Sequence, residues 1–431
     1  MSLRKRPNIL FFLPDQHRYD FVSTNPDLSI RTPNIDMIAR RGVAFTKAFC
    51  PSPLCAPSRA CLASGKSYHH CGVINNHYDY PLDQPTYYSA LKNAGYHVAT
   101  VGKLDLHKGT LYWKLDGSYL LHELGFSEGI DNEGKEAAPY SGAEVPKGPY
   151  MAYLHKKELA EIHVKDFQNR QSYKDTHPTP LPEEAYCDNW VTNNGLELLK
   201  KFPKDRPWYL TVNFTGPHNP MDVTKDMWSR WDGVKFPLPN CNNQFDTQTH
   251  NRIRQNYAAM IENIDRNIGI LIDEVKNRDD LDNTIIIYSS DHGEMLGDHN
   301  LWEKSIYYQP SVGIPMTISG PGMSQGLTSD ALVQLYDLAA TILDYAGVEP
   351  MHDVDSMSLR DVLEGRRTDH RKFIVSSLDN ITWPNKNLCQ PWDMIFDGRY
   401  KLVLVRNTEP ILFDLLNDPL ENVNISKKKK G

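Results

Sequence analysis

Short apolar runs recur along this 431-residue chain, with polar, helix-like patterns between them. The runs are Ile9 to Leu13, Tyr96 to Val101, Tyr209 to Phe214, Thr284 to Tyr288 and Pro315 to Ile318. Such short runs without polar alternation are typical of parallel strands buried on both faces. The clearest helical pattern places apolar residues from Tyr257 to Val275 at spacings of three and four. Strands alternating with helices predict an α/β fold with a mostly parallel central sheet flanked by helices.

The pattern changes after about Gly365. Short apolar segments then follow one another with only turns between them, at Phe373 to Ser377, Met394 to Phe396, Tyr400 to Val405 and Ile411 to Asp414. This arrangement predicts a small C-terminal antiparallel α+β subdomain. We therefore expect a catalytic α/β domain over residues 1–364 and a subdomain over residues 365–431. The polar, weakly periodic segment from Lys108 to Pro207 is expected to form loops and short helices around a site.

Composition excludes several classes of protein. A formal charge of −7 and a pI near 6.1 give no general attraction to nucleic acid. The seven cysteines form no CxxC pair and do not suggest a disulfide scaffold. The apolar run from Asn8 to Leu13 is too short for a signal-peptide core, and no window is long enough to span a bilayer. We expect a soluble chain, periplasmic or secreted if a signal has been removed and otherwise cytoplasmic.

Polar side chains follow the predicted strands at their carboxyl ends. Asp15 and Gln16 follow the first strand, Lys103 the second, His218 the third, and Asp291 and His292 the fourth. Ligands of open α/β sheets bind at this edge, so these residues are expected to converge. Two carboxylates, an amide oxygen and an imidazole suit a divalent cation. The alternative is that each aspartate only caps a helix or a turn.

Four cations lie near the same strand ends: Arg59, Lys66, Lys103 and Lys304. Together with a metal they would suit a tetrahedral oxyanion such as sulfate or phosphate. Each lysine alone is more typically a surface residue. His218 lies between two prolines, which is the fixed placement that a general acid needs.

Cys55 begins the segment CAPSR, which ends at Arg59. Its thiol could be a buried core group, a metal ligand or a nucleophile, and a nucleophilic cysteine needs a base and a lowered pKa. The composition of the segment does not decide between these roles.

Six segments in order resemble the type I sulfatases of the alkaline-phosphatase superfamily: RPNILFFLPDQ, TPNIDMIARRGVAFTKAFCPSPLCAPSR, GYHVATVGK, NFTGPHNP, SSDHGEMLGDHNLWEK and DGRYKLVLV. The resemblance covers nearly the whole chain and implies an alkaline-phosphatase-like fold. It also implies that a formylglycine-generating maturation enzyme oxidises Cys55 to formylglycine. A hydroxyl of the hydrated aldehyde would then attack sulfur and expel the alcohol.

The resemblance assigns roles to individual residues. One divalent metal would be held by Asp15, Gln16, Asp291 and His292 together with the modified Cys55. Arg59 would stabilise the aldehyde hydrate, and Lys103 and Lys304 would bind the sulfate oxygens. His218 would help to protonate the leaving alcohol.

Two departures from the family pattern leave alternatives open. Many members have two aspartates where this chain has Asp15 and Gln16, and a glutamine and a histidine suit Mn²⁺ as well as Ca²⁺. The family resemblance makes Ca²⁺ the expected ion, with Mn²⁺ or Mg²⁺ as alternatives. The usual GKxH pattern is replaced by a lysine, a leucine and Asp105, with His107 two places later. Either Asp105 or His107 could take the role of the family histidine, which is thought to assist breakdown of the sulfated hydrate.

We therefore expect a sulfatase that hydrolyses a sulfate ester, with a sulfated carbohydrate as the substrate class. The aromatic residues of the Lys108 to Pro207 segment could supply stacking contacts to a sugar. A phosphonate monoester or phosphodiester hydrolase on the same scaffold is the alternative enzyme. A catalytically silent carbohydrate-binding protein is the alternative from another class, and the full set of metal and cation positions argues against it.

Overall fold

The first apolar run of the chain, Ile9 to Leu13, lies in the middle of the central sheet. The computed structural model describes residues 6–241, 243–379 and 390–427. Its main sheet has eight strands in the order β5-β4-β6-β1-β7-β8-β2-β9. These strands are β1 (Asn8–Phe12), β2 (Gly42–Phe45), β4 (His97–Gly102), β5 (Glu128–Asp131), β6 (Trp208–Asn213), β7 (Thr284–Ser289), β8 (Met316–Ser319) and β9 (Leu327–Ser329). A short parallel pair, β3 (Ala48–Phe49) and β10 (Val333–Gln334), lies outside it.

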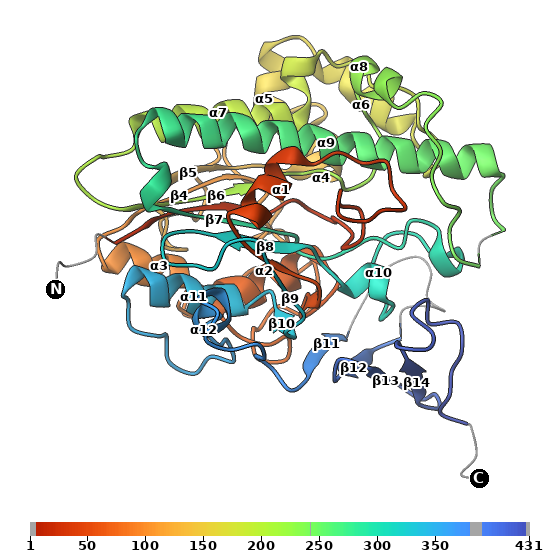
Figure 1. Cartoon of the computed structure of the whole chain (residues 1–431). Coiled ribbons are helices and arrows are strands. Elements are labelled where there is room, and N and C mark those ends of the chain that lie inside the picture. Colours follow the sequence, from red (N-terminus) through yellow and green to blue (C-terminus); the bar gives the residue numbers. More distant parts are fainter. Residues whose placement is uncertain (1–5, 242, 380–389, 428–431) are drawn as a thin grey trace.

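Helices cover both faces of this sheet (Figure 1). The helices are α1 (Pro33–Arg40), α2 (Cys55–Ser64), α3 (Tyr87–Asn93), α4 (Gly134–Gly142), α5 (Pro149–Lys156), α6 (Ala160–Gln168), α7 (Cys187–Lys201), α8 (Lys225–Arg230), α9 (Thr247–Asn277), α10 (Gln309–Val312), α11 (Asp337–Ala346) and α12 (Arg360–Leu363). Short 3₁₀ turns lie at Glu183–Ala185, Leu281–Asn283 and Asp298–Asn300. Helices α1, α7 and α9 pack on one face, and α2, α3 and α11 lie on the other.

Strand β1 shows why its sequence has no polar alternation. Ile9 and Phe11 belong to the hydrophobic cluster on the α2 and α3 side, whereas Leu10 and Phe12 belong to the cluster under α7 and α9. All four side chains are fully buried. Because successive side chains point to opposite faces, a strand covered on both faces needs apolar residues at every position. The predicted α/β fold with helices on both faces is confirmed.

One predicted strand has the opposite direction. The run Pro315 to Ile318 was expected to be parallel, but β8 pairs antiparallel with both β7 and β2. The chain leaves β7 at its carboxyl end and enters β8 from that same end, through residues 290–315. A parallel strand would need a crossover back to the other end of the sheet, and no such crossover is present in this segment.

The segment from Lys108 to Pro207 is more regular than predicted. It contains strand β5 and the 15-residue helix α7, besides the short helices α4, α5 and α6. Gly195 interrupts the periodicity of α7 because the helix lies close to its neighbours there. A Cβ atom at Gly195 would lie 3.3 Å from a methyl group of Leu271 and 3.4 Å from one of Val101. The weak pattern therefore reflects close packing, not the absence of a helix.

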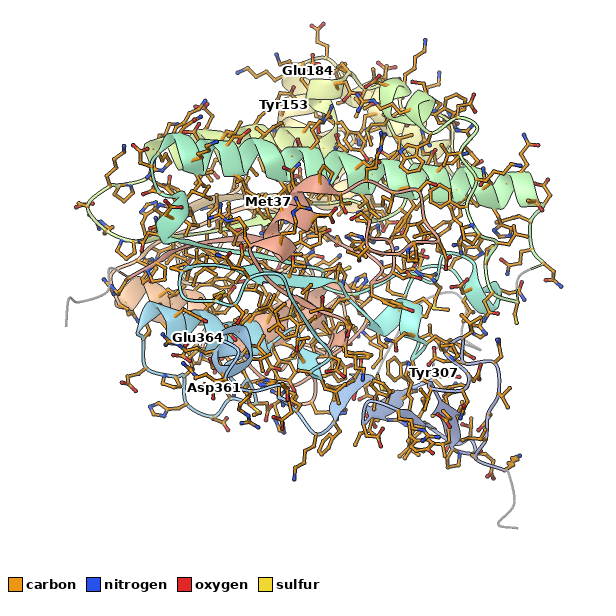
Figure 2. All side chains as sticks on the ribbon, viewed as in Figure 1. Met37, Tyr153, Glu184, Tyr307, Asp361 and Glu364 are labelled. Atoms are coloured by element: carbon orange, nitrogen blue, oxygen red, sulfur yellow. The ribbon has the colours of Figure 1, made fainter. Side chains whose placement is uncertain are left out.

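The C-terminal strands form a separate antiparallel sheet, as predicted. Its strands are β11 (Ile374–Leu378), β12 (Trp392–Phe396), β13 (Tyr400–Val405) and β14 (Ile411–Asp414), in that order. Figure 2 shows Tyr307 beside these strands, and the Tyr307 carbonyl accepts a hydrogen bond of 3.1 Å from Lys401 of β13. The domain boundary at residues 364 and 365 stays a prediction.

Among the residues that the structure describes, no helix has both the length and the apolar character needed to cross a membrane.

Candidate active site

The residues that follow β1 and β7 meet at the amino end of α2. Ligand atoms of Asp15, Cys55, Asp291 and His292 all lie within 4.8 Å of one another, and all four residues are buried. Asp15 follows β1 and Asp291 follows β7, its neighbour in the sheet. Cys55 is the first residue of α2, a helix that accepts Pro57 in its first turn and ends at Gly65 with φ +68°. The sheet edge thus brings together four residues from three segments that lie far apart in the sequence.

Cys55 lies in an electropositive environment. Its Sγ atom is 3.3 Å from Nε2 of His292, 3.7 Å from Nζ of Lys103 and 3.8 Å from Oδ1 of Asp15. Burial raises the pKa of the Cys55 thiol, but the cations, led by Lys103, outweigh it and lower the pKa to about 5. Burial instead raises the pKa of Cys50 well above its usual value. The environment around Cys55 therefore favours negative charge.

The buried carboxylates of Asp15 and Asp291 both lie against cations. Arg59 donates from Nε to Oδ2 of Asp291 at 2.9 Å, and its Nη2 lies 3.5 Å from Oδ2 of Asp15. Lys103 forms an ion pair with the same oxygen of Asp15. Burial raises the pKa of Asp15, but the positive charges of Lys103 and Arg59 outweigh burial and hold it well below its usual value. Two carboxylates beside an imidazole and the Cys55 side chain fit a divalent cation.

Gln16 lies beside this group and links it to Lys304. Its backbone N–H donates to Oδ1 of Asp291 at 3.0 Å, and its side-chain oxygen accepts from Nζ of Lys304 at 2.5 Å. The Gln16 amide nitrogen donates to Glu294, a buried residue that also accepts a hydrogen bond of 2.9 Å from Tyr173. Glu294 was not singled out from the sequence, although it lies in the same motif as Asp291 and His292.

Lys304 and His218 form a second group close to the cysteine. Nδ1 of His218 lies 2.6 Å from the carbonyl oxygen of Asn219 and therefore carries the proton. Nε2 is then the acceptor, 2.7 Å from Nζ of Lys304. Burial and Lys304 lower the pKa of His218 to about 3. His218 is therefore neutral, with a protonated lysine in contact with its free nitrogen.

Asp105 and His107 occupy different surroundings. The Asp105 carboxylate lies 3.3 Å from Nζ of Lys103 and 2.7 Å from Nζ of Lys108. Nε2 of His107 instead lies 2.7 Å from Oδ2 of the buried Asp131. Lys66 is not brought to the site, because it pairs with Asp353 at 3.0 Å.

A cavity of about 510 Å³ opens next to Lys103, His218 and Lys304. Its wall combines apolar groups such as Leu111 and Phe167 with hydrogen-bonding groups. The remaining lining residues are Leu54, Asn75, Asn76, His77, Lys108, Gly109, Glu133, Lys135, Glu136, Ala137 and Tyr140. Most of these were not predicted, because they lie on loops and on α4, where the sequence has no periodic signal. Glu136 accepts a hydrogen bond of 2.8 Å from Asn219, next to His218.

The model of the sulfatase family matches residues 7–348 of this chain. The chain belongs to the sulfatase family. The model for the C-terminal part of N-sulphoglucosamine sulphohydrolase matches residues 297–431. An arylsulfatase of Clostridium perfringens is 27% identical over 97% of this chain and 90% of its own length. A choline-sulfatase of Rhizobium meliloti is 28% identical over 99% of this chain and 83% of its own length. An N-acetylglucosamine-6-O-sulfatase of Bacteroides thetaiotaomicron is 27% identical over 98% of this chain and 83% of its own length.

Solved structures share the fold at lower identity. One, in complex with its substrate D-glucosamine-2-N,6-O-disulfate, has a TM-score of 0.78 at 22% identity, covering 98% of this chain and 94% of that chain. The phosphonate monoester hydrolase of Agrobacterium radiobacter has a TM-score of 0.82 at 22% identity, and the match covers 98% of this chain and 92% of that chain. The predicted family and fold are confirmed. This sulfatase is accordingly a sulfuric ester hydrolase.

Proposed function

We propose that this sulfatase hydrolyses a sulfate ester of a carbohydrate and that Cys55 is converted to formylglycine for this purpose. The observation that carries the proposal is the placement of Cys55 within 4.8 Å of the Asp15, Asp291 and His292 ligand atoms. The carbohydrate class is supported by the relative that is an N-acetylglucosamine-6-O-sulfatase. The cavity fits this class because a sugar presents both hydroxyl groups and an apolar face.

One divalent metal would be held by Asp15, Gln16, Asp291, His292 and the modified Cys55. When bound, it would act as a Lewis acid and lower the pKa of a coordinated hydroxyl group. Ca²⁺ is our first choice, because oxygen ligands predominate, with Mn²⁺ or Mg²⁺ as alternatives. Calorimetric titration of each ion into metal-stripped protein measures this preference independently of activity.

The cations of the chain would bind and orient the sulfate group. Arg59 is fixed by Asp291 and by a hydrogen bond of 2.6 Å to the carbonyl oxygen of Lys103, so it would hold the hydrated aldehyde of Cys55. Lys103 and Lys304 would contact the sulfate oxygens, because both line the cavity. Their fixed positive charges would stabilise the negative charge that moves onto the leaving oxygen.

The proton for the leaving alcohol would be held between His218 and Lys304. The two nitrogens are 2.7 Å apart, and both residues line the cavity in which the alcohol would lie. Asp105 and His107 are the two candidates for the role of the family histidine. We propose that Asp105 acts near the sulfate, because its carboxylate contacts Lys103 and Lys108. The ring of His107 instead forms an ion pair with Asp131.

The decisive experiment measures the modification and the reaction on the same sample. The chain is produced together with a formylglycine-generating enzyme, alkylated and digested with trypsin. The peptide from Ala48 to Arg59 contains Cys50 and Cys55, so Cys50 serves as an internal control that must be alkylated. We expect Cys55 to resist alkylation and to weigh about 18 Da less than a thiol. A Cys55→Ala chain is the inactive control.

Paired aryl sulfate and aryl phosphonate esters then distinguish the two enzyme classes. The phosphonate alternative is retained because the fold of a phosphonate monoester hydrolase matches with a TM-score of 0.82. We expect faster cleavage of the sulfate ester. An unmodified thiol after co-production would refute the proposed nucleophile, and faster cleavage of the phosphonate would favour the alternative enzyme.

A further inference from the structure

Glu294 is a fully buried carboxylate to which the proposed mechanism gives no role. Its Oε1 atom accepts hydrogen bonds from the backbone N–H groups of Leu296 at 2.8 Å and of Glu303 at 2.7 Å. Its Oε2 atom accepts from the Tyr173 hydroxyl at 2.9 Å and from the side-chain nitrogen of Gln16. All four partners donate, so Glu294 acts only as an acceptor.

The side-chain amide of Gln16 has one orientation that suits these neighbours. Its oxygen and its NH₂ group occupy similar volumes, so only hydrogen bonds distinguish the two ends. The nitrogen faces Glu294, and the oxygen accepts from Nζ of Lys304 at 2.5 Å. A rotated amide would place its oxygen against the Glu294 carboxylate and its NH₂ group against the Lys304 ammonium. Two acceptors would then meet on one side and two donors on the other.

Asn219 favours the same orientation of the Gln16 amide. Its side-chain nitrogen donates to Oε1 of Glu136 at 2.8 Å, so its side-chain oxygen faces Gln16 and accepts from the amide nitrogen at 3.3 Å. Among the residues that the structure describes, Lys304 is the only donor to the Gln16 oxygen. An amide oxygen has two lone pairs, so one remains for a further ligand.

The backbone of Gln16 is fixed as firmly as its side chain. Its φ angle is +70°, a region that residues other than glycine seldom adopt. Its N–H group donates to Oδ1 of Asp291 at 3.0 Å, and its carbonyl oxygen accepts from the Tyr257 hydroxyl at 2.6 Å. Such a conformation persists where the surrounding structure holds it in place. Each polar atom of Gln16 therefore has a hydrogen-bond partner that fixes it.

We propose that Glu294 is a positioning residue for the metal site, because it turns the Gln16 amide so that the oxygen is available to the ion. This inference rests on the proposed function, in which Gln16 is one of the metal ligands. Hard divalent cations bind amide oxygens, whereas an amide in the opposite orientation would direct N–H donors towards the ion. The contact also gives a reason for an amide at position 16, since a carboxylate there would meet the carboxylate of Glu294.

Calorimetric titration of Ca²⁺, and separately of Mn²⁺, into metal-stripped chains tests the proposal. All chains are produced together with the maturation enzyme. Glu294→Gln is nearly isosteric and can still accept from Leu296 and Glu303, but its own amide can meet either end of the Gln16 amide. For the ion that the parent chain binds more tightly, we expect affinity to fall about ten- to hundredfold, as is typical of groups that orient metal ligands.

The matched control is Glu303→Gln. The charge of Glu303 interacts with Lys304, but its carboxylate is not hydrogen-bonded to Gln16. Burial raises the pKa of Glu303 to about 7, so titrations at about pH 8 compare two carboxylates that are both mostly ionised. We expect the control to change the affinity by less than about threefold, because its charge acts only from a distance.

A double-mutant cycle separates orientation of the amide from general damage to the fold. Gln16→Met removes the amide oxygen and should weaken metal binding at least as much as Glu294→Gln. Because Glu294 acts through Gln16, adding Glu294→Gln to Gln16→Met should cost less than about threefold further. Thermal unfolding of each stripped chain shows whether it is folded.

Three outcomes would overturn the role of Glu294 and leave the metal site intact: unchanged binding by Glu294→Gln, an equal loss with Glu303→Gln, or full additivity in the cycle. If Glu294→Gln does not fold, Gln16→Glu tests the same contact. A further carboxylate ligand normally strengthens Ca²⁺ binding, so a gain of about tenfold would overturn the inference, and no gain would support it. Absence of Ca²⁺ and Mn²⁺ binding by the parent chain would overturn the proposed metal site and this inference together.

Discussion

At the scale of single residues, the proposed mechanism gives Lys103 charge stabilisation alone and gives Lys304 proton delivery as well. Lys103 lies against Asp15 and 3.7 Å from Cys55, whereas Lys304 lies 2.7 Å from His218. Burial together with Lys304 lowers the pKa of His218 to about 3, so the imidazole does not carry a positive charge of its own at neutral pH. In the proposed mechanism, the protonated Lys304 is then the source from which the departing alkoxide would take a proton.

The first prediction concerns His218→Gln. If the pair delivers a proton to the leaving group, the loss should depend on how basic that group is. We expect kcat to fall about 10²- to 10⁴-fold with a sugar or alkyl sulfate but less than about tenfold with nitrophenyl sulfate, whose phenolate leaves unaided. Steady-state rates on the two esters measure the difference. Equal losses on both would show that His218 only shapes the cavity.

A second prediction distinguishes Asp105 from His107. Asp105→Asn removes the carboxylate that holds Lys103 and Lys108, so we expect kcat to fall about 10²-fold through misplacement of the cations. Inhibition by inorganic sulfate should weaken in parallel, which a purely structural effect on folding would not produce. His107→Gln should leave kcat within about threefold and cost about 3 kcal/mol of stability, because Asp131 stays buried without its partner. The reverse pattern would assign the catalytic role to His107.

At the scale of elements, loops and helix ends hold the site in place more than strand interiors do. Glu133 illustrates this, because its carboxylate accepts hydrogen bonds from the backbone of Tyr150 at 3.2 Å and of Met151 at 3.3 Å. These N–H groups belong to the first turn of α5, where the helix itself provides no hydrogen-bond acceptor for them. Glu133 also lines the catalytic cavity, so the cap of α5 is part of the cavity wall.

The third prediction follows from the burial of this cap. Burial raises the pKa of Glu133 from 4.5 to about 7. The folded state therefore prefers the protonated form, and stability declines as the pH rises from about 4.5 through about 7. Glu133→Gln cannot ionise, so its stability relative to the parent should increase by about 2 kcal/mol between pH 5 and pH 7. Urea unfolding at a series of pH values tests this, and a constant difference would contradict it.

At the scale of the whole molecule, the C-terminal sheet completes the main core. Ile374 and Trp392 of that sheet belong to the same buried cluster as Phe11 and Phe49. The Trp392 ring nitrogen donates to the carbonyl oxygen of Ser305 at 3.2 Å, one residue after Lys304. The sheet thereby supports the loop that carries one of the cations of the site.

The fourth prediction is that the chain unfolds in a single transition, although we expect a domain boundary near residue 364. Because the two parts share one hydrophobic cluster, neither should be stable alone. Scanning calorimetry should give one peak with equal calorimetric and van't Hoff enthalpies, and a chain ending at residue 364 should not fold. Two separate peaks would show that the subdomain is independent.

The sequence by itself determined five strands of the main sheet, the four strands of the C-terminal sheet and the polar residues that follow the main strands, but it did not predict β2, β5 or β9. These follow from local rules, since burial on both faces requires unbroken apolar runs such as Ile9 to Leu13. The tertiary structure alone decided the direction of β8, the presence of α7 and the different surroundings of Asp105 and His107. Each of these depends on which groups lie nearby in space. No local sequence signal shows that β8 starts from the sheet edge at which β7 ends. Likewise, nothing local shows that Gly195 of α7 packs against Leu271, or that His107 lies beside the buried Asp131.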